Sequence, residues 1–392
     1  MRIALLTYST RARGGVVHAL ELAEALAAGG EQVRLFALEK PGRVGFFRPT
    51  DVPVGLIPVE ERPGESVADR IARYIDAYVD YFERAVSGSD YDIFHAEDCI
   101  SANALIRLRR DGRVPAVVRT VHHVDDFTTP ALVTCQDDSI LEPDVVLVVS
   151  EWWRARLASV YGVEATVVHN GVDVRRFVPP VSPEAREEER GRSGLTGTVT
   201  VLAVGGVEPR KNSLVLLEAF TAVAPELAVA TGRRPRLLFV GGETLFDYRE
   251  YRDAFERRLA DLAAAGRLEA GSVVITGPVE DRVLLSLYRG ADLLAFPSVR
   301  EGWGLTVLEA QACGTPVVAS DIDVLREYLV DGRDALLVPP GDAGALGRAI
   351  VRATTDASLI ARLRAGGLET ARRFGWDSSA RRHLDVYRRL IG

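Results

Sequence analysis

Residues 297–310, Pro-Ser-Val-Arg-Glu-Gly-Trp-Gly-Leu-Thr-Val-Leu-Glu-Ala, indicate the fold of this chain most directly. An apolar segment, 291–296, precedes them, and residues 314–316, Gly-Thr-Pro, lead into a second apolar segment at 317–320. This order predicts strand, loop, helix and strand, the repeating unit of an open α/β sheet. Glu301 would then lie at the carboxyl end of a strand, where such sheets bind their ligands.

The residues that follow Glu301 predict a ligand that carries both hydroxyl groups and phosphate. Gly302 and Gly304 allow the backbone amides at the start of the next helix to approach an anion closely. Glu309 lies further along that helix, and we expect it to face the same crevice. Two carboxylates beside a glycine-rich helix start suit a nucleotide sugar.

Length and composition favour a two-domain enzyme. The chain has 392 residues, enough for two domains that each bury a core, and its net charge of -7 argues against a nucleic-acid-binding protein. The first apolar segment is short and no apolar stretch approaches membrane-spanning length, so we expect a cytoplasmic protein. The scattered Cys99, Cys135 and Cys313 are expected to be reduced thiols. The arginine-rich composition, with lysine only at Lys40 and Lys211, fits a bacterium with a GC-rich genome.

Apolar segments that alternate with helical patterns predict two parallel α/β sheets. The strands expected in the first half are residues 2–8, 33–38, 91–95, 114–121, 145–150 and 166–168. Those expected in the second half are residues 198–204, 236–240, 272–276, 293–296, 316–319 and 335–338. We assign the first domain to 1–178 and the second to 198–375, with an interdomain linker at 179–197 because the charged stretch 183–194 breaks the periodicity.

The loop after the first strand of the second half carries adjacent cations. Arg210 and Lys211 stand where a helix begins, and two cations at a helix start favour a diphosphate over the alternative of a solvated surface pair. In the first half, Gly14 and Gly15 offer backbone amides after the first strand, but the spacing is not Gly-x-Gly-x-x-Gly, which disfavours a nicotinamide dinucleotide.

A histidine-rich loop closes another strand of the first half. Residues 119–126 read Arg-Thr-Val-His-His-Val-Asp-Asp, and His122 can hydrogen-bond a sugar hydroxyl or a phosphate oxygen. The two histidines and two aspartates also resemble metal ligands. They are bunched in one loop, however, so we expect no metal site.

Taken together, these residues resemble family 4 of the retaining glycosyltransferases over nearly the whole chain. The resemblance implies the GT-B architecture, in which two Rossmann-like, doubly wound parallel-sheet domains face each other across a cleft, and a last helix, here 376–392, crosses back onto the first domain. It implies catalytic roles for His122, Glu301 and Lys211. The donor-binding residues that it implies are Gly15, Gly206, Arg210, Val279, Gly302, Trp303, Gly304, Leu305 and Glu309.

By this resemblance the chain transfers a hexose from a nucleoside-diphosphate sugar to a hydroxyl acceptor with retention, and needs no metal or other cofactor. In the family the first acid faces the donor sugar, the second binds the ribose, and the histidine contacts the transferred sugar. Two departures stand out: Gly206 where the family usually has arginine, and His123 where an aspartate often follows the histidine.

The alternatives are a non-catalytic nucleotide-sugar-binding or scaffold protein, and an epimerase or phosphorylase on the same fold. Acceptor contacts are expected from the loops 41–63 and 127–138, whose sequences do not identify the acceptor. The sequence also leaves the donor base, the donor sugar and the oligomeric state open. The basic face of the last helix is interpreted as solvated, and membrane contact is not indicated.

Overall fold

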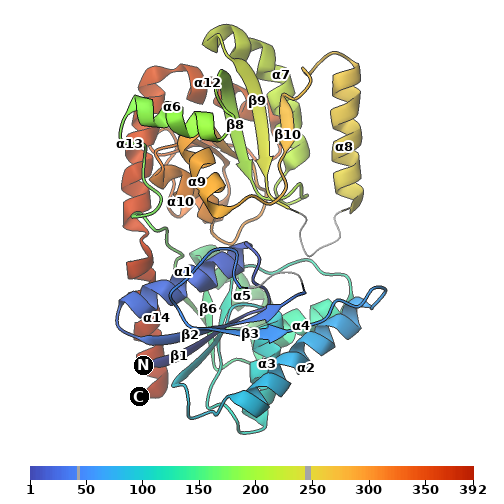
Figure 1. The fold of residues 1–392 in the computed structure, drawn as a ribbon, viewed down its shortest axis with the longest axis vertical. Helices are drawn as coiled ribbons and strands as arrows, with labels where there is room; N and C mark the ends of the chain where they lie inside the picture. The colour runs from blue at the N-terminus through green and yellow to red at the C-terminus, as the bar shows by residue number, and fades with distance from the viewer. Residues whose placement is uncertain (42–44, 243–248) are drawn as a thin grey trace. The chain divides into compact units, whose positions relative to one another are not determined.

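The computed structural model describes residues 1–41, 45–242 and 249–392, and these divide into two compact units (Figure 1). The first unit comprises residues 1–171 and 376–392, and the second comprises residues 172–375. Each unit is built on its own parallel sheet, and helices cover both faces of that sheet. The expectation of two doubly wound parallel-sheet domains is therefore confirmed.

The sheet of the first unit has the order β3-β2-β1-β4-β5-β6-β7, and every neighbouring pair is parallel. Its strands are β1 (Arg2–Thr7), β2 (Gln32–Glu39), β3 (Val54–Pro58), β4 (Ile93–Ala96), β5 (Val118–Val121), β6 (Val145–Val148) and β7 (Ala165–Val167). Its helices are α1 (Gly14–Ala28), α2 (Val67–Ala85), α3 (Cys99–Arg110), α4 (Pro130–Leu141), α5 (Glu151–Tyr161) and α14 (Trp376–Ile391). The strand order reverses between β1 and β4, and in sheets of this kind ligands bind at the carboxyl ends of the strands that flank such a reversal.

The sheet of the second unit has the order β10-β9-β8-β11-β12-β13, and it is likewise parallel. Its strands are β8 (Thr198–Val204), β9 (Arg234–Val240), β10 (Val273–Ile275), β11 (Leu293–Phe296), β12 (Val317–Ser320) and β13 (Leu336–Val338). Its helices are α6 (Pro183–Arg192), α7 (Ser213–Thr231), α8 (Arg249–Ala264), α9 (Asp281–Gly290), α10 (Leu305–Ala312), α11 (Asp323–Arg326), α12 (Ala343–Thr355) and α13 (Ala357–Arg373). Here the reversal falls between β8 and β11, so the loops that follow these two strands flank the expected ligand position.

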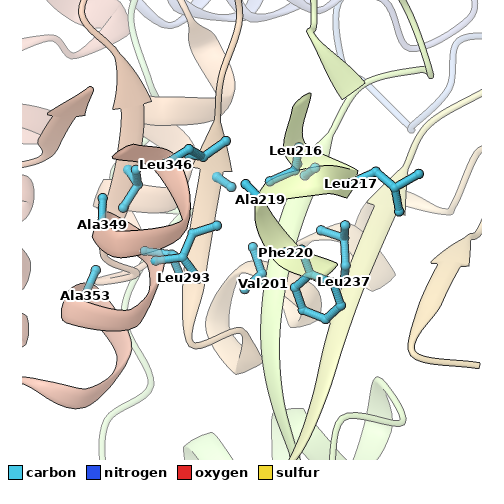
Figure 2. Packing of buried hydrophobic residues seen from close by; sticks show 14 of the residues in the cluster. Val201, Leu216, Leu217, Ala219, Phe220, Leu237, Leu293, Leu346, Ala349 and Ala353 are labelled. Carbon is cyan, nitrogen blue, oxygen red and sulfur yellow. The ribbon is translucent and has the colours of Figure 1, made fainter. Parts of the chain in front are cut away.

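The core of the second unit explains why one helix is unusually apolar. Helix α7 has the length and mean hydropathy, 1.6, of a membrane span, so the expectation that no apolar stretch approaches that length is wrong. Figure 2 shows, however, that Leu216 and Phe220 of α7 pack with Val201 and Leu237 of the sheet and with Leu346 of α12. These contacts bury one apolar face of α7 inside the unit, as in the core helix of an α/β domain.

The boundary between the units differs from the expected one. The second unit begins at Val172 and not after residue 178, and the expected linker at 179–197 contains helix α6. Ser182 caps α6 and Pro183 opens it, which is a helix-start signal that the dense charge obscured. Arg190 anchors this helix because its guanidinium is buried and pairs with Asp292.

Regular structure also occupies segments expected to be loops. Strand β3 lies within residues 41–63, of which 42–44 fall outside the described residues, and α4 begins within residues 127–138. Strand β5 begins later than expected because Pro115, which has no backbone N–H, interrupts the apolar run. The three cysteines are free thiols, as expected.

Candidate active site

Two loops of the second unit bring three of the predicted site residues together at the β8/β11 reversal. The β8–α7 loop carries Arg210 and Lys211, and the β11–α10 loop carries Glu301. The Lys211 Nζ atom lies 2.5 Å from Glu301 Oε1, and the Arg210 Nη1 atom lies 3.1 Å from the same oxygen. A backbone hydrogen bond from Val299 N–H to the Arg210 carbonyl, 2.8 Å, ties the two loops together. The arrangement therefore concentrates two cations and one carboxylate at the edge where ligands bind in such sheets.

Burial and neighbouring charges oppose each other in setting the pKa values of this cluster. Burial alone would raise the pKa of Glu301, but Lys211 and Arg210 outweigh it and lower that pKa to about 2. Burial lowers the pKa of Lys211, although the Glu301 carboxylate opposes the shift. Lys211 also lies 4.6 Å from the centre of the Phe296 ring, a cation–π contact. At neutral pH the cluster thus holds a carboxylate that two cations share.

The low pKa of Glu301 predicts an acid-dependent stability. The folded pKa, about 2, is below the ordinary 4.5, so ionised Glu301 stabilises the fold above pH 4.5 and loses this effect as the pH falls toward 2. The full shift corresponds to about 3 kcal/mol. Urea unfolding should therefore show wild type more stable than Glu301→Gln at pH 7, with a smaller gap at pH 3.5. A gap that stays constant with pH would contradict the assignment.

Two helices begin at this edge without a side-chain cap. Helix α7 follows Asn212, whose φ is 56°, and α10 follows Gly304, whose φ is 103°; neither residue caps its helix through a side chain. In α7 the Tyr251 hydroxyl accepts a hydrogen bond of 3.0 Å from the Leu214 amide. The other first-turn amides, together with the positive end of the helix dipole, favour an anion. A Cβ atom at Gly304 would lie 2.8 Å from the Tyr328 hydroxyl, so both the backbone conformation and the packing require glycine there.

The other predicted donor-binding residues of the second unit have distinct surroundings. The Trp303 ring is buried against Tyr328 and Phe374, with ring centres 4.7 and 5.3 Å away, so its side chain belongs to the core. The buried Glu309 carboxylate accepts a hydrogen bond of 2.7 Å from the Tyr288 hydroxyl of α9. The remaining three lie in loops or at a helix start: Gly302 and Leu305 flank Trp303 and Gly304, and Val279 follows β10.

Gly206, which replaces the arginine of the family, packs too tightly for any side chain. A Cβ atom there would lie 2.6 Å from the backbone oxygen of Gly242 and 3.1 Å from Glu208 Oε1. The loop after β8 thus touches the loop after β9 through backbone atoms. This backbone therefore requires glycine at position 206, because an arginine would fit there only if one of the two loops shifted.

Gly206→Arg should consequently destabilise the fold and should not improve nucleotide binding. Overpacking of this kind costs about 1–3 kcal/mol, which should appear as a lower denaturation midpoint, and Gly206→Ala should share part of the loss. Gly191→Arg is the matched control because a Cβ atom at Gly191 meets nothing within 4 Å. A Gly206→Arg protein as stable as wild type, with tighter nucleotide binding, would refute this account.

The first unit brings Gly15 and His122 together at its own β1/β4 reversal. A Cβ atom on Gly15 would lie 3.3 Å from His122 Cδ2. His122 Nε2 lies 3.0 Å from Glu97 Oε2, whereas His123 Nε2 pairs with Asp125 Oδ2 at 3.1 Å. The two adjacent histidines therefore have different partners and do not share one group of ligands in that loop.

Two residues beside His122, Glu97 and His18, were not predicted from the sequence as site residues. Glu97 directly follows β4, so the rule that ligands lie at carboxyl strand ends could have indicated it. His18 is on α1, where its burial resembles that of a core residue. Its Nδ1 atom lies 2.9 Å from Asn170 Oδ1, a contact between residues far apart in the sequence that no local pattern predicts.

Known proteins resemble this chain over nearly its whole length. The family described as Glycosyltransferase Family 4 matches residues 12–176, and the family Glycosyl transferases group 1 matches residues 198–356. D-inositol 3-phosphate glycosyltransferase of Xylanimonas cellulosilytica is 31% identical, over 95% of this chain and 91% of the relative. Phosphatidyl-myo-inositol mannosyltransferase of Mycobacterium leprae is 30% identical, over 99% and 96%. The crystal structure of Anabaena HepE in complex with UDP-glucose has the same fold, with a TM-score of 0.77 and 17% identity over 98% of this chain and 99% of that one.

Proposed function

Because the chain belongs to the family 4 and group 1 glycosyltransferases, we propose that it moves a hexose from a nucleoside-diphosphate sugar to a hydroxyl acceptor, with the anomeric configuration retained. The observation that carries this proposal is the cluster at the β8/β11 reversal. There Lys211 and Arg210 share the carboxylate of Glu301 beside the starts of helices α7 and α10. A diphosphate supplies the negative charge that these cations and amides favour.

In this proposal the cations act on the leaving group. Lys211, Arg210 and the amides at the starts of α7 and α10 offset the charge that builds on the diphosphate as the bond to the sugar breaks. Phosphate oxygens replace Glu301 as partners of the two cations when the donor binds. The Glu301 carboxylate is then available to accept hydrogen bonds from sugar hydroxyls, which links donor binding to orientation of the sugar.

Glu309 and His122 also bind the donor in this proposal. The Glu309 carboxylate accepts a hydrogen bond from the Tyr288 hydroxyl, and in this proposal it also accepts hydrogen bonds from the ribose hydroxyls. His122 hydrogen-bonds a hydroxyl of the transferred sugar. The protein would supply charge and orientation without a metal at the diphosphate, since Lys211 and Arg210 fill that role.

The relatives suggest which acceptors to test first. The names of two of them refer to inositol 3-phosphate and to phosphatidyl-myo-inositol. We therefore propose a polyol that carries a phosphate or phosphodiester as the acceptor class. In this chain His123 directly follows His122, where the family often has an aspartate. This departure is compatible with a different polyol acceptor.

The test is a transfer assay with defined donors and acceptors. UDP-glucose, UDP-N-acetylglucosamine, GDP-mannose and ADP-glucose are each incubated with inositol 3-phosphate, or with phosphatidylinositol vesicles. Release of nucleoside diphosphate and the anomeric coupling constant of the product are measured. A product with the anomeric configuration of its donor supports the proposal, and inversion would contradict it. Nucleotide-sugar binding without transfer or donor hydrolysis would instead favour a binding or scaffold protein.

A further inference from the structure

A buried cluster of histidines surrounds one carboxylate in the first unit. Glu97 follows β4, and its side chain is fully buried together with His18 of α1. The titratable or charged groups that border this carboxylate come from every neighbouring element: His18, His95, Asp98, Arg119, His122, His383 and Tyr387. Of the six histidines in the chain, four belong to this cluster. Such a concentration of titratable groups away from solvent is costly unless the groups share protons.

The contacts of His18 fix which of its nitrogen atoms carries a proton. Its Nδ1 atom lies 2.9 Å from Asn170 Oδ1, and a carbonyl oxygen only accepts hydrogen bonds. Nδ1 therefore donates, and Nε2 is an unprotonated acceptor in the neutral ring. This Nε2 atom faces Glu97 Oε2 at 3.5 Å, too far for a good hydrogen bond. His18 thus provides no proton to the carboxylate, which leaves His122 as the nearest donor.

The position of Glu97 then indicates which nitrogen atom of His122 carries the proton. His122 Nε2 lies 3.0 Å from Glu97 Oε2, a hydrogen-bond distance at which the ring donates and the carboxyl oxygen accepts. The second nitrogen, Nδ1, is left as an acceptor. The His122 side chain is 14% exposed, whereas that of Glu97 is not exposed at all. Gly15 borders the ring so closely that a larger residue there would press on it.

Burial disfavours the charged form of each of these groups. It raises the pKa of Glu97 to about 7, lowers the pKa of His18 to about 3, and lowers that of His122 well below its usual range. His122 is consequently neutral at pH 7, so its two nitrogen atoms differ: one donates and the other accepts. A neutral ring needs a partner to select one tautomer.

We propose that Glu97 is a positioning residue that holds His122 with its proton on Nε2, so that the bare Nδ1 accepts a hydrogen bond from a hydroxyl of the substrate sugar. The inference rests on the proposed function, in which His122 contacts that sugar. Glu97 itself is buried behind His122 and acts only through the ring. A histidine whose far nitrogen is held by a carboxylate is a recurrent way to set a tautomer.

The test reads the tautomer directly in the full chain. Six histidines make ¹⁵N-histidine spectra tractable, and His122→Asn assigns the His122 signals. Wild type should show His122 protonated on Nε2. Glu97→Leu removes the acceptor and should give a mixture of tautomers with turnover reduced about 10–100-fold and unchanged nucleotide affinity. Glu97→Gln keeps an acceptor oxygen and should retain both the Nε2–H tautomer and most of the activity.

Controls separate this role from a merely structural one. Glu21→Gln changes another buried carboxylate of the same unit, one that pairs with Arg48 at 2.7 Å, and should leave the His122 signals unmoved. If Glu97→Leu does not fold, Glu97→Gln still decides: the pH dependence of the His122 shifts near pH 7 should be present in wild type and absent in the variant. A proton on Nδ1 in wild type would overturn the proposal. Stoichiometric zinc in the purified protein would also overturn it, because ligand atoms of His18, Glu97 and His122 lie within 4.8 Å of one another and could hold a metal ion in place of the proton.

The same experiment distinguishes failure of this inference from failure of the proposed function. A tautomer that changes in Glu97→Leu without any change in turnover overturns the positioning role and leaves the transferase intact. The expected tautomer in a chain that transfers no sugar overturns the proposed function, and with it the part that the inference assigns to the sugar hydroxyl.

Discussion

Lys211→Ala should lower turnover about 10²–10³-fold, which is the loss seen when one preorganised group that stabilises transition-state charge is removed. In the structure the Lys211 side chain is 15% exposed and its ammonium contacts Glu301 at 2.5 Å, and Lys211 is the only lysine in the sequence of the second unit. Its removal takes away one of the two cations beside Glu301, so the net charge offered to a diphosphate falls. Steady-state rates with saturating donor measure the effect.

The chain offers a matched control for this variant. Lys40 is the other lysine, it lies in the first unit, and it pairs with the exposed Glu61 at 3.3 Å. Lys40→Ala removes the same charge from a solvated position and should leave turnover within about twofold, because exposed ion pairs contribute little. Comparable losses in both variants would show that the effect comes from net charge and not from the β8/β11 edge.

Asp292→Ala should lower the free energy of unfolding by about 3–5 kcal/mol, the cost of breaking a buried ion pair from one side. Asp292 accepts hydrogen bonds from Arg186, Arg190 and Arg233 at 3.1–3.2 Å, and from the Thr200 amide at 2.8 Å. The Arg190 side chain is 1% exposed, so the variant would leave a buried guanidinium without its carboxylate. Urea unfolding of the ligand-free protein measures the loss.

The control for Asp292 is an exposed pair in the same unit. Glu256 on α8 lies 2.9 Å from Arg252, one turn away, and its side chain is 53% exposed. Glu256→Ala should cost about 0.5 kcal/mol or less. If Asp292→Ala cost no more than Glu256→Ala, the network that anchors α6 to the β11 strand would have no energetic importance.

The sequence was sufficient to predict the two sheets and the part of the candidate site that lies in the second unit. Parallel strands are buried on both faces, so their apolar runs are visible, and the loop after each strand shows where Lys211 and Glu301 lie. The sequence was not sufficient to predict side-chain contacts that tertiary packing forms between segments far apart in the chain. Tyr288 meets Glu309 from another helix, and the contacts of Glu97 come from α1 and from the loop after β5.

The expected linker was wrong because the charge of this segment outweighed its helix-start signal in the prediction. The run 183–194 is so rich in charge that it resembled a linker, yet Ser182 and Pro183 begin a helix whose Arg190 is buried. Gly206 stands where the family usually has arginine, and the sequence offers no reason for this departure. The structure gives a steric reason, since the Gly242 backbone occupies the space that a side chain would need.

The most direct test of the account is calorimetric titration with UDP, GDP and ADP, because the central claim is that the β8/β11 edge of the second unit binds a nucleoside diphosphate. Wild type, Lys211→Ala and Lys40→Ala are compared at one salt concentration. The account predicts micromolar binding of one nucleotide that is lost in Lys211→Ala and kept in Lys40→Ala. Absence of binding for all three nucleotides, or equal binding by wild type and Lys211→Ala, would contradict it.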